Sequence, residues 1–141
     1  MGSSGGVRVL VTDDEDEIRN VLSEFLGHKG HDVRNARNGA EAVRTVNEDP
    51  FLQVVLLDVS MPEMGGIEAL NFIMDRDNPP SAIMMTAVAD REVARQALKT
   101  GAFDYILKPF DFALIESSIA ACLSQKEFKK QPWWKRLARR Q

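Results

Sequence analysis

The chain has 141 residues, of which 44% are hydrophobic and 28% charged, and its formal net charge is −3. This length suffices for one domain with a single core, and the composition is that of an ordinary globular protein. The single cysteine, Cys122, excludes an internal disulfide, no apolar run approaches the roughly 18 residues of a membrane span, and no signal peptide opens the chain. We therefore expect a cytoplasmic protein in which Cys122 is a buried structural thiol.

Strand and helix patterns alternate along the chain from residue 7. The Gly-rich residues 1–6 are expected to be a disordered lead-in or a remnant of cloning. Runs of β-branched and apolar residues predict five strands, at residues 7–12, 31–36, 52–57, 82–87 and 103–107. Apolar residues at helical spacing, with capping residues and glycines at the ends, predict five helices, at residues 16–29, 40–47, 65–74, 90–101 and 111–123.

This alternation predicts an α/β fold, because five strands joined through helices by short links form a parallel sheet with helices on both faces. The central strand is expected at residues 52–57, where four consecutive apolar residues, 54–57, indicate burial on both faces. In such a doubly wound sheet, ligands bind outside the carboxyl ends of the strands, where the strand order reverses.

Polar side chains stand at the carboxyl ends of four predicted strands. Asp13 and Asp14 follow the first strand, Asp58 follows the third, Thr86 is near the end of the fourth, and Lys108 follows the fifth. Because parallel strands end at the same edge of a sheet, we expect these five side chains to form one site.

The residue types at this edge point to phosphoryl chemistry. Three carboxylates that lie close together repel one another unless a cation is present. Hard oxygen ligands suit Mg²⁺, which keeps some waters and takes further ligands from a phosphate. Asp58 can then attack phosphorus and form an acyl phosphate, whereas Lys108 would neutralise the phosphoryl oxygens and Thr86 would donate a hydrogen bond to one of them.

Over residues 7–125 the sequence resembles the receiver domain of two-component response regulators. The resemblance rests on the acidic pair Asp13–Asp14, on Asp58 before a Met-Pro loop, on Thr86–Ala87 and on Lys108-Pro109-Phe110. It implies a flavodoxin-like, five-stranded sheet of order 2-1-3-4-5, with Asp58 as the phosphoacceptor.

The resemblance also implies the cofactor and its ligands. Mg²⁺, or Mn²⁺ in its place, would be held by Asp13, Asp14, Asp58 and the backbone carbonyl of Ser60.

Further implied features concern the switch. The peptide bond between Lys108 and Pro109 would be cis, and Tyr105 would turn inward when Thr86 moves toward the phosphoryl group. Ser60 and Val88 occupy positions that tune the lifetime of the phosphoryl group in the family. Because neither side chain helps to orient an attacking water, we expect slow self-hydrolysis.

As a receiver domain, the chain is expected to accept its phosphoryl group from a histidine kinase or a phosphotransfer protein. It would catalyse only its own phosphorylation and dephosphorylation, and so would be a switch rather than an enzyme. The surface expected to change comprises the helix at 90–101, the strand at 103–107 and the helix at 111–123, which would pass the signal to a homodimer partner or an effector.

The alternative function is an Mg²⁺-dependent phosphatase or phosphotransferase with an Asp nucleophile. Enzymes of that kind carry a second Asp two residues after the nucleophile, as general acid and base. This chain has Ser60 at that position, which favours the switch.

The segment 126–141 differs from the rest of the chain in charge. It holds seven Lys or Arg and one Glu, a net charge of +6, whereas the remainder holds 11 basic and 20 acidic residues, a net charge of −9. We interpret it as a basic tail or interdomain linker. Trp133 and Leu137, spaced i and i+4 among basic residues, also fit a membrane surface, a partner groove or nucleic acid, but this interpretation is less favoured.

Other polar and glycine residues near the predicted site are expected to be structural. Asp16 and Glu17 suit the first turn of a helix, and Gly65 and Gly66 form a turn rather than a nucleotide-binding loop. His28 and His31 are expected at the surface or in a turn, away from the acidic edge.

Overall fold

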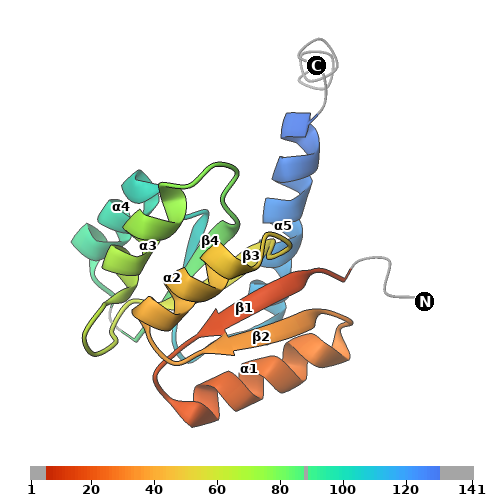
Figure 1. Cartoon of the computed structure of the whole chain (residues 1–141). Coiled ribbons are helices and arrows are strands. Elements are labelled where there is room, and N and C mark those ends of the chain that lie inside the picture. The colour runs from red at the N-terminus through yellow and green to blue at the C-terminus, as the bar shows by residue number, and fades with distance from the viewer. Residues whose placement is uncertain (1–5, 88, 131–141) are drawn as a thin grey trace. The chain divides into compact units, whose positions relative to one another are not determined.

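The computed structural model describes residues 6–87 and 89–130, and the chain divides into two compact units after Phe110. The first unit contains five parallel strands in one sheet, in the order β2-β1-β3-β4-β5, with helices between them (Figure 1). The strands are β1 (Arg8–Thr12), β2 (Asp32–Ala36), β3 (Val54–Asp58), β4 (Ser81–Thr86) and β5 (Asp104–Leu107). The predicted fold class and strand order are confirmed.

Four helices complete the first unit: α1 (Asp16–His28), α2 (Gly39–Glu48), α3 (Gly66–Met74) and α4 (Arg91–Thr100). Helix α1 contacts β1 and β2 on one face of the sheet (Figure 1). Helices α2, α3 and α4 lie side by side on the other face, and each contacts a strand of the sheet. This layering is the one that parallel strands with helical crossovers require.

Hydrophobic side chains are buried on both faces of the sheet. All five residues of β3 are buried, as expected for a strand covered by helices on both sides. Alternate strand residues such as Leu10, Val55, Leu57 and Met84 join the core cluster beneath α2, α3 and α4. The central position of β3 places Asp58, its last residue, in the middle of the carboxyl edge.

Polar side chains cap two of these helices. The side chain of Asn38 accepts a hydrogen bond from the N–H of Glu41 at 2.8 Å and so caps α2. Asp90 caps α4 by accepting from the N–H of Glu92 at 2.9 Å, and Gly101 ends that helix with φ = 127°.

The second unit contains helix α5 (Phe112–Lys130). Asp111 accepts a hydrogen bond from the N–H of Ala113 at 2.9 Å at the start of this helix. Cys122 of α5 is a buried free thiol, as predicted. The first residues of the basic segment 126–141 continue α5, whereas residues 131–141 lie outside the described part of the chain, as do residues 1–5 of the predicted lead-in.

His31, expected at the surface or in a turn, is buried beside β1 and β2. Its side chain is buried, with 8% of the residue exposed, and its Nδ1 accepts a hydrogen bond from the N–H of Val7 at 3.2 Å. The imidazole therefore joins the start of β2 to the residue before β1, a long-range contact that sequence spacing does not reveal.

Helices α1 and α4 each expose an apolar residue. Val21 of α1 is 46% exposed and Leu98 of α4 is 50% exposed. The elements packed against these helices therefore leave part of their apolar residues in solvent.

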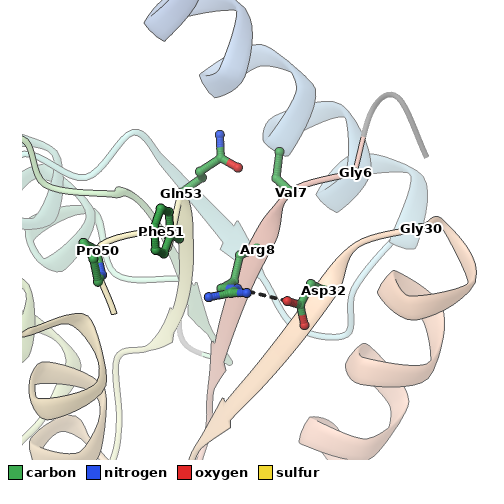
Figure 2. Close-up of a pocket in the computed structure, with 8 residues that line it drawn as sticks. All are labelled: Gly6, Val7, Arg8, Gly30, Asp32, Pro50, Phe51 and Gln53. Carbon is green, nitrogen blue, oxygen red and sulfur yellow. Dashed lines mark hydrogen bonds and ion pairs between the residues drawn. The ribbon is translucent and has the colours of Figure 1, made fainter. Parts of the chain in front are cut away.

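The amino end of the sheet carries an ion-paired arginine. Arg8 Nε donates to Asp32 Oδ2 at 3.0 Å, and Nη1 contacts Asp49 at 3.1 Å. Figure 2 shows Arg8 and Asp32 among the residues that line a pocket, together with Phe51, a residue 72% exposed. We call Arg8, Asp32 and Asp49 the amino-end cluster; it joins β1, β2 and the segment between α2 and β3.

No helix in the described ranges 6–87 and 89–130 is long and apolar enough to cross a membrane.

Candidate functional site

The carboxyl edge of the sheet brings together residues far apart in the sequence. Asp13 follows β1 and is fully buried, Asp58 ends β3 and is 3% exposed, and Thr86 ends β4 and is 2% exposed. Lys108 follows β5, and its backbone N–H donates to the carbonyl of Thr86 at 2.7 Å. Asp14, the remaining predicted site residue at the strand ends, is exposed.

Lys108 bridges the buried carboxylates. Its Nζ donates to Asp13 Oδ2 at 2.7 Å and lies 3.4 Å from Asp58 Oδ2. The Lys108 side chain is only 13% exposed, and those of Asp13 and Asp58 are 0% and 4% exposed. We call these three residues the carboxyl-end cluster. Two buried carboxylates share one ammonium, so the cluster is short of positive charge.

Burial and the shortage of positive charge change the pKa of Asp58. Burial and the neighbouring charge of Asp13 raise the pKa of Asp58 from 3.8 to about 6, against the opposing effects of Lys108 and the Ser60 N–H. Burial lowers the pKa of Lys108, but the hydrogen bond that Lys108 donates to Asp13 and the charges of both carboxylates outweigh it, so the pKa is raised. Lys108 therefore remains charged near neutral pH, whereas the charged form of Asp58 is disfavoured by its surroundings.

The acidic side chains fit a divalent cation. Carboxylate oxygens of Asp13, Asp14 and Asp58 all lie within 4.8 Å of one another. A set of oxygen ligands with one exposed member, Asp14, leaves positions for water, which is the arrangement that Mg²⁺ takes in proteins.

The other predicted residues lie around this cluster in different ways. Ser60 is exposed, and its N–H points to Asp58 Oδ1 at 3.4 Å. Tyr105 of β5 is partly buried against the core cluster. The Lys108–Pro109 peptide bond is cis. Val88 lies outside the described residues.

Two residues of the site were not identified from the sequence. Glu15 Oε1 lies 4.0 Å from Lys108 Nζ, and its N–H donates to Asp13 Oδ1 at 3.0 Å. Arg19 of α1 donates through Nη1 to the carbonyl of Asp13 at 2.7 Å and also pairs with Asp16. Glu15 lies in the acidic run after β1, but only the turn of the chain into α1 brings Arg19 to Asp13.

The fold and the site together define a class. A parallel sheet of order 2-1-3-4-5, with its polar cluster at the carboxyl edge, is a flavodoxin-like α/β domain with a ligand site at the switch in strand order. Its acidic cluster is suited to a metal ion, and its buried lysine is suited to an anion.

Comparison with known proteins gives the family. The response regulator receiver domain model matches residues 9–120. The regulatory protein AtoC of Escherichia coli is 39% identical over 124 residues, which are 88% of this chain and 27% of AtoC. The chemotaxis protein CheY of Halobacterium salinarum is 37% identical over 83% of this chain and 97% of its own length.

A solved structure agrees with this assignment. The CheX–CheY–BeF₃–Mg²⁺ complex from Borrelia burgdorferi contains a chain that matches with a TM-score of 0.78 and 30% identity, over 83% of this chain and 89% of that one. The chain therefore belongs to the response regulator receiver family, a family of signalling domains. It spans about a quarter of the length of AtoC and of the PilR and ZraR regulators that it also matches.

Proposed function

We propose that this receiver domain accepts a phosphoryl group on Asp58 and uses it as a switch. The observation that carries the proposal is the position of Lys108 Nζ, which lies 2.7 Å from the Asp13 carboxylate and 3.4 Å from that of Asp58. The hydrogen bond to Asp13 thus holds the ammonium group beside the Asp58 carboxylate, where a transferred phosphoryl group would be attached.

The transfer requires one bond to form and one to break. A carboxylate oxygen of Asp58 bonds to phosphorus while phosphorus separates from its donor, a histidine nitrogen of the partner protein or an acetate oxygen of acetyl phosphate. The bonding electrons leave with the donor group. Lys108 neutralises an equatorial oxygen, and the Thr86 hydroxyl donates to another. Because the acceptor Asp58 belongs to the domain itself, the domain catalyses only its own phosphorylation and, with water as the nucleophile, its own dephosphorylation.

The proposed cofactor is Mg²⁺, with Mn²⁺ as a substitute. Asp13, Asp14, Asp58 and the carbonyl of Ser60 would hold it, a proposal supported by the carboxylate oxygens lying within 4.8 Å of one another. When bound, the ion neutralises phosphoryl charge. Asp14→Ala should weaken Mg²⁺ binding at least tenfold in a calorimetric titration. Glu17→Ala, an exposed acidic residue in the same stretch, is the control and should bind as wild type does.

The proposed phosphodonor is a histidine kinase or a phosphotransfer protein in the cytoplasm. The family assignment supports this partner, because receiver domains interact with such proteins. AtoC and ZraR, which are regulators several times the length of this chain, support a downstream effector. For the segment 126–141 we propose a basic linker or tail, with membrane or nucleic-acid binding less favoured.

The proposed output surface comprises α4, β5 and α5, and it would bind a homodimer partner or an effector. Two observations support α4 and β5: they contact each other, and they expose Leu98 and Leu107 at 50% and 46%. Thr86 and Tyr105 would act as the switch. Amide exchange should change most between Thr86 and Leu123 on phosphorylation. Changes confined to α1 and α2 would contradict this part of the proposal.

A phosphatase or phosphotransferase acting on other substrates is the less favoured alternative. Ser60 stands where such an enzyme carries its second Asp, and its side chain has no acid or base function. Slow self-hydrolysis, expected from Ser60 and Val88, remains a prediction. The measured lifetime of the phosphorylated protein tests it.

Intact mass spectrometry tests the central proposal. Wild-type protein treated with acetyl phosphate and Mg²⁺ should gain the mass of one phosphoryl group, and Asp58→Asn should gain none. Equal labelling of the two proteins would show that Asp58 is not the acceptor.

A further inference from the structure

Gly66, the first residue of α3, is buried directly on the backbone at the end of β3. A Cβ atom at this position would lie 2.8 Å from Val59 Cα and 2.9 Å from the carbonyl carbon of Asp58, and closer still to the Asp58 carbonyl oxygen. These are backbone atoms, so rotation of a side chain cannot relieve the overlap. The N–H of Gly66 also donates to the carbonyl of Val59 at 2.9 Å.

The same piece of backbone is held from its other side by β4. Asp58 is in register with Met85, and the N–H of Val59 donates to the Met85 carbonyl at 2.9 Å. The end of β3 is thus fixed between a strand and the first turn of a helix. A side chain at residue 66 must therefore push α3 outward or displace residues 58–60 from their pairing with β4.

We propose that Gly66 is a positioning residue for Asp58: the lack of a side chain at residue 66 lets α3 hold the backbone that carries the acceptor carboxylate. This inference rests on the proposed function of Asp58. Residues 58–60 include the carboxylate that lies 3.4 Å from Lys108 Nζ and the Ser60 carbonyl proposed as a metal ligand. A displacement of about 1 Å at a reacting group can slow a reaction by roughly 100-fold.

The neighbouring Gly65 supplies a matched control. A Cβ at Gly65 would meet only the Val59 carbonyl oxygen, at 3.4 Å. Its backbone angles, φ −73° and ψ 170°, are open to alanine. Helix propensity alone would make alanine favourable at residue 66, so loss of function there would have to come from the contact with Asp58 and Val59. Leu26→Ala, in the buried face of α1, controls for loss of stability.

The experiment compares wild type, Gly66→Ala, Gly65→Ala and Leu26→Ala under conditions where circular dichroism shows each to be folded. We expect Gly66→Ala to incorporate phosphoryl groups from acetyl phosphate at least tenfold more slowly and to bind Mg²⁺ at least threefold more weakly. The two controls should stay within twofold of wild type. Backbone NMR shifts should change at residues 58–60 in Gly66→Ala and remain in place in Gly65→Ala, a readout that needs no phosphorylation.

Each outcome decides a separate claim. If wild type is labelled and Gly66→Ala is labelled at the same rate, the positioning role is wrong and the proposed function survives. If wild type itself is not labelled, the proposed function fails, while the NMR comparison still tests whether residue 66 holds residues 58–60. If Gly66→Ala is unfolded, the comparison is repeated in trimethylamine N-oxide, which favours compact states. Failure to fold even then would overturn the proposal, because Gly66 would be a requirement of the fold as a whole.

Discussion

The two ends of the sheet carry the same set of charges in different surroundings. The amino-end cluster and the carboxyl-end cluster each consist of one basic residue between two aspartates. The carboxylates at the carboxyl end are 0% and 4% exposed, against 53% and 17% at the amino end. Solvent screens the charges of the amino-end cluster, so its ion pairs are expected to contribute little to stability.

Burial gives the carboxyl-end cluster properties that its counterpart lacks. With little water available, the charge of Asp13 acts strongly on Asp58 and raises its pKa to about 6. A cation bound beside Asp58 would compensate the negative charge that its surroundings disfavour. The same residue types therefore have different electrostatic properties at the two ends of the sheet, because only those at the carboxyl edge are buried.

Replacing the basic residue of each cluster should give the largest difference in the rate of phosphoryl incorporation. Lys108→Met should slow phosphoryl incorporation from acetyl phosphate by about 100-fold, because it removes a charge aimed at the transferred group. Arg8→Met should leave the rate within twofold of wild type. A similar loss of rate in both variants would show that the carboxyl end has no special role.

The raised pKa of Asp58 predicts a pH-dependent stability in metal-free protein. The folded state holds a proton on Asp58 up to about pH 6, whereas the unfolded state releases it near pH 3.8. The stabilisation is therefore full below about pH 4 and is lost as the pH rises through 6. At pH 8, Asp58→Asn should be more stable than wild type by on the order of 3 kcal/mol.

Urea unfolding in EDTA at several pH values measures this effect. The difference between Asp58→Asn and wild type should vanish near pH 4 and grow up to about pH 7. A difference that does not depend on pH would show that the Asp58 carboxylate is not under-neutralised in the folded protein.

The smallest effect is expected from the amino-end cluster itself. Arg8→Met should lower the unfolding midpoint slightly, because Arg8 pairs with two carboxylates that solvent reaches. In 1 M NaCl the difference from wild type should mostly disappear, since salt screens exposed charges. A large loss of stability that persists in high salt would indicate that Arg8 contributes mainly by packing, for example against Phe51.

The fold and most of the cluster at the carboxyl edge could be predicted from the sequence for a physical reason. The alternation of strands and helices requires a parallel sheet, and a parallel sheet brings the ends of its strands to one edge. Asp13, Asp58, Thr86 and Lys108 could therefore be placed together without knowledge of any contact. The resemblance to receiver domains supplied the strand order.

The features that sequence reasoning missed depend on contacts between unrelated positions. The buried His31 accepts a hydrogen bond from the N–H of Val7. Arg19 donates to the carbonyl of Asp13 because the chain turns between β1 and α1. Gly66 appeared to be a turn residue, and only the approach of α3 to Asp58 shows that a side chain would not fit there. Neither the periodicity nor the composition of the sequence indicates such long-range contacts.

Reductive trapping tests the central claim most directly. Borohydride reduces an aspartyl phosphate to homoserine, so peptide mapping locates the modified residue. After treatment with acetyl phosphate and Mg²⁺, homoserine should appear at residue 58 and at no other aspartate, and omission of Mg²⁺ should abolish it. Homoserine at another position, or equal conversion of residue 58 in EDTA, would contradict a metal-dependent phosphoacceptor at the carboxyl end of β3.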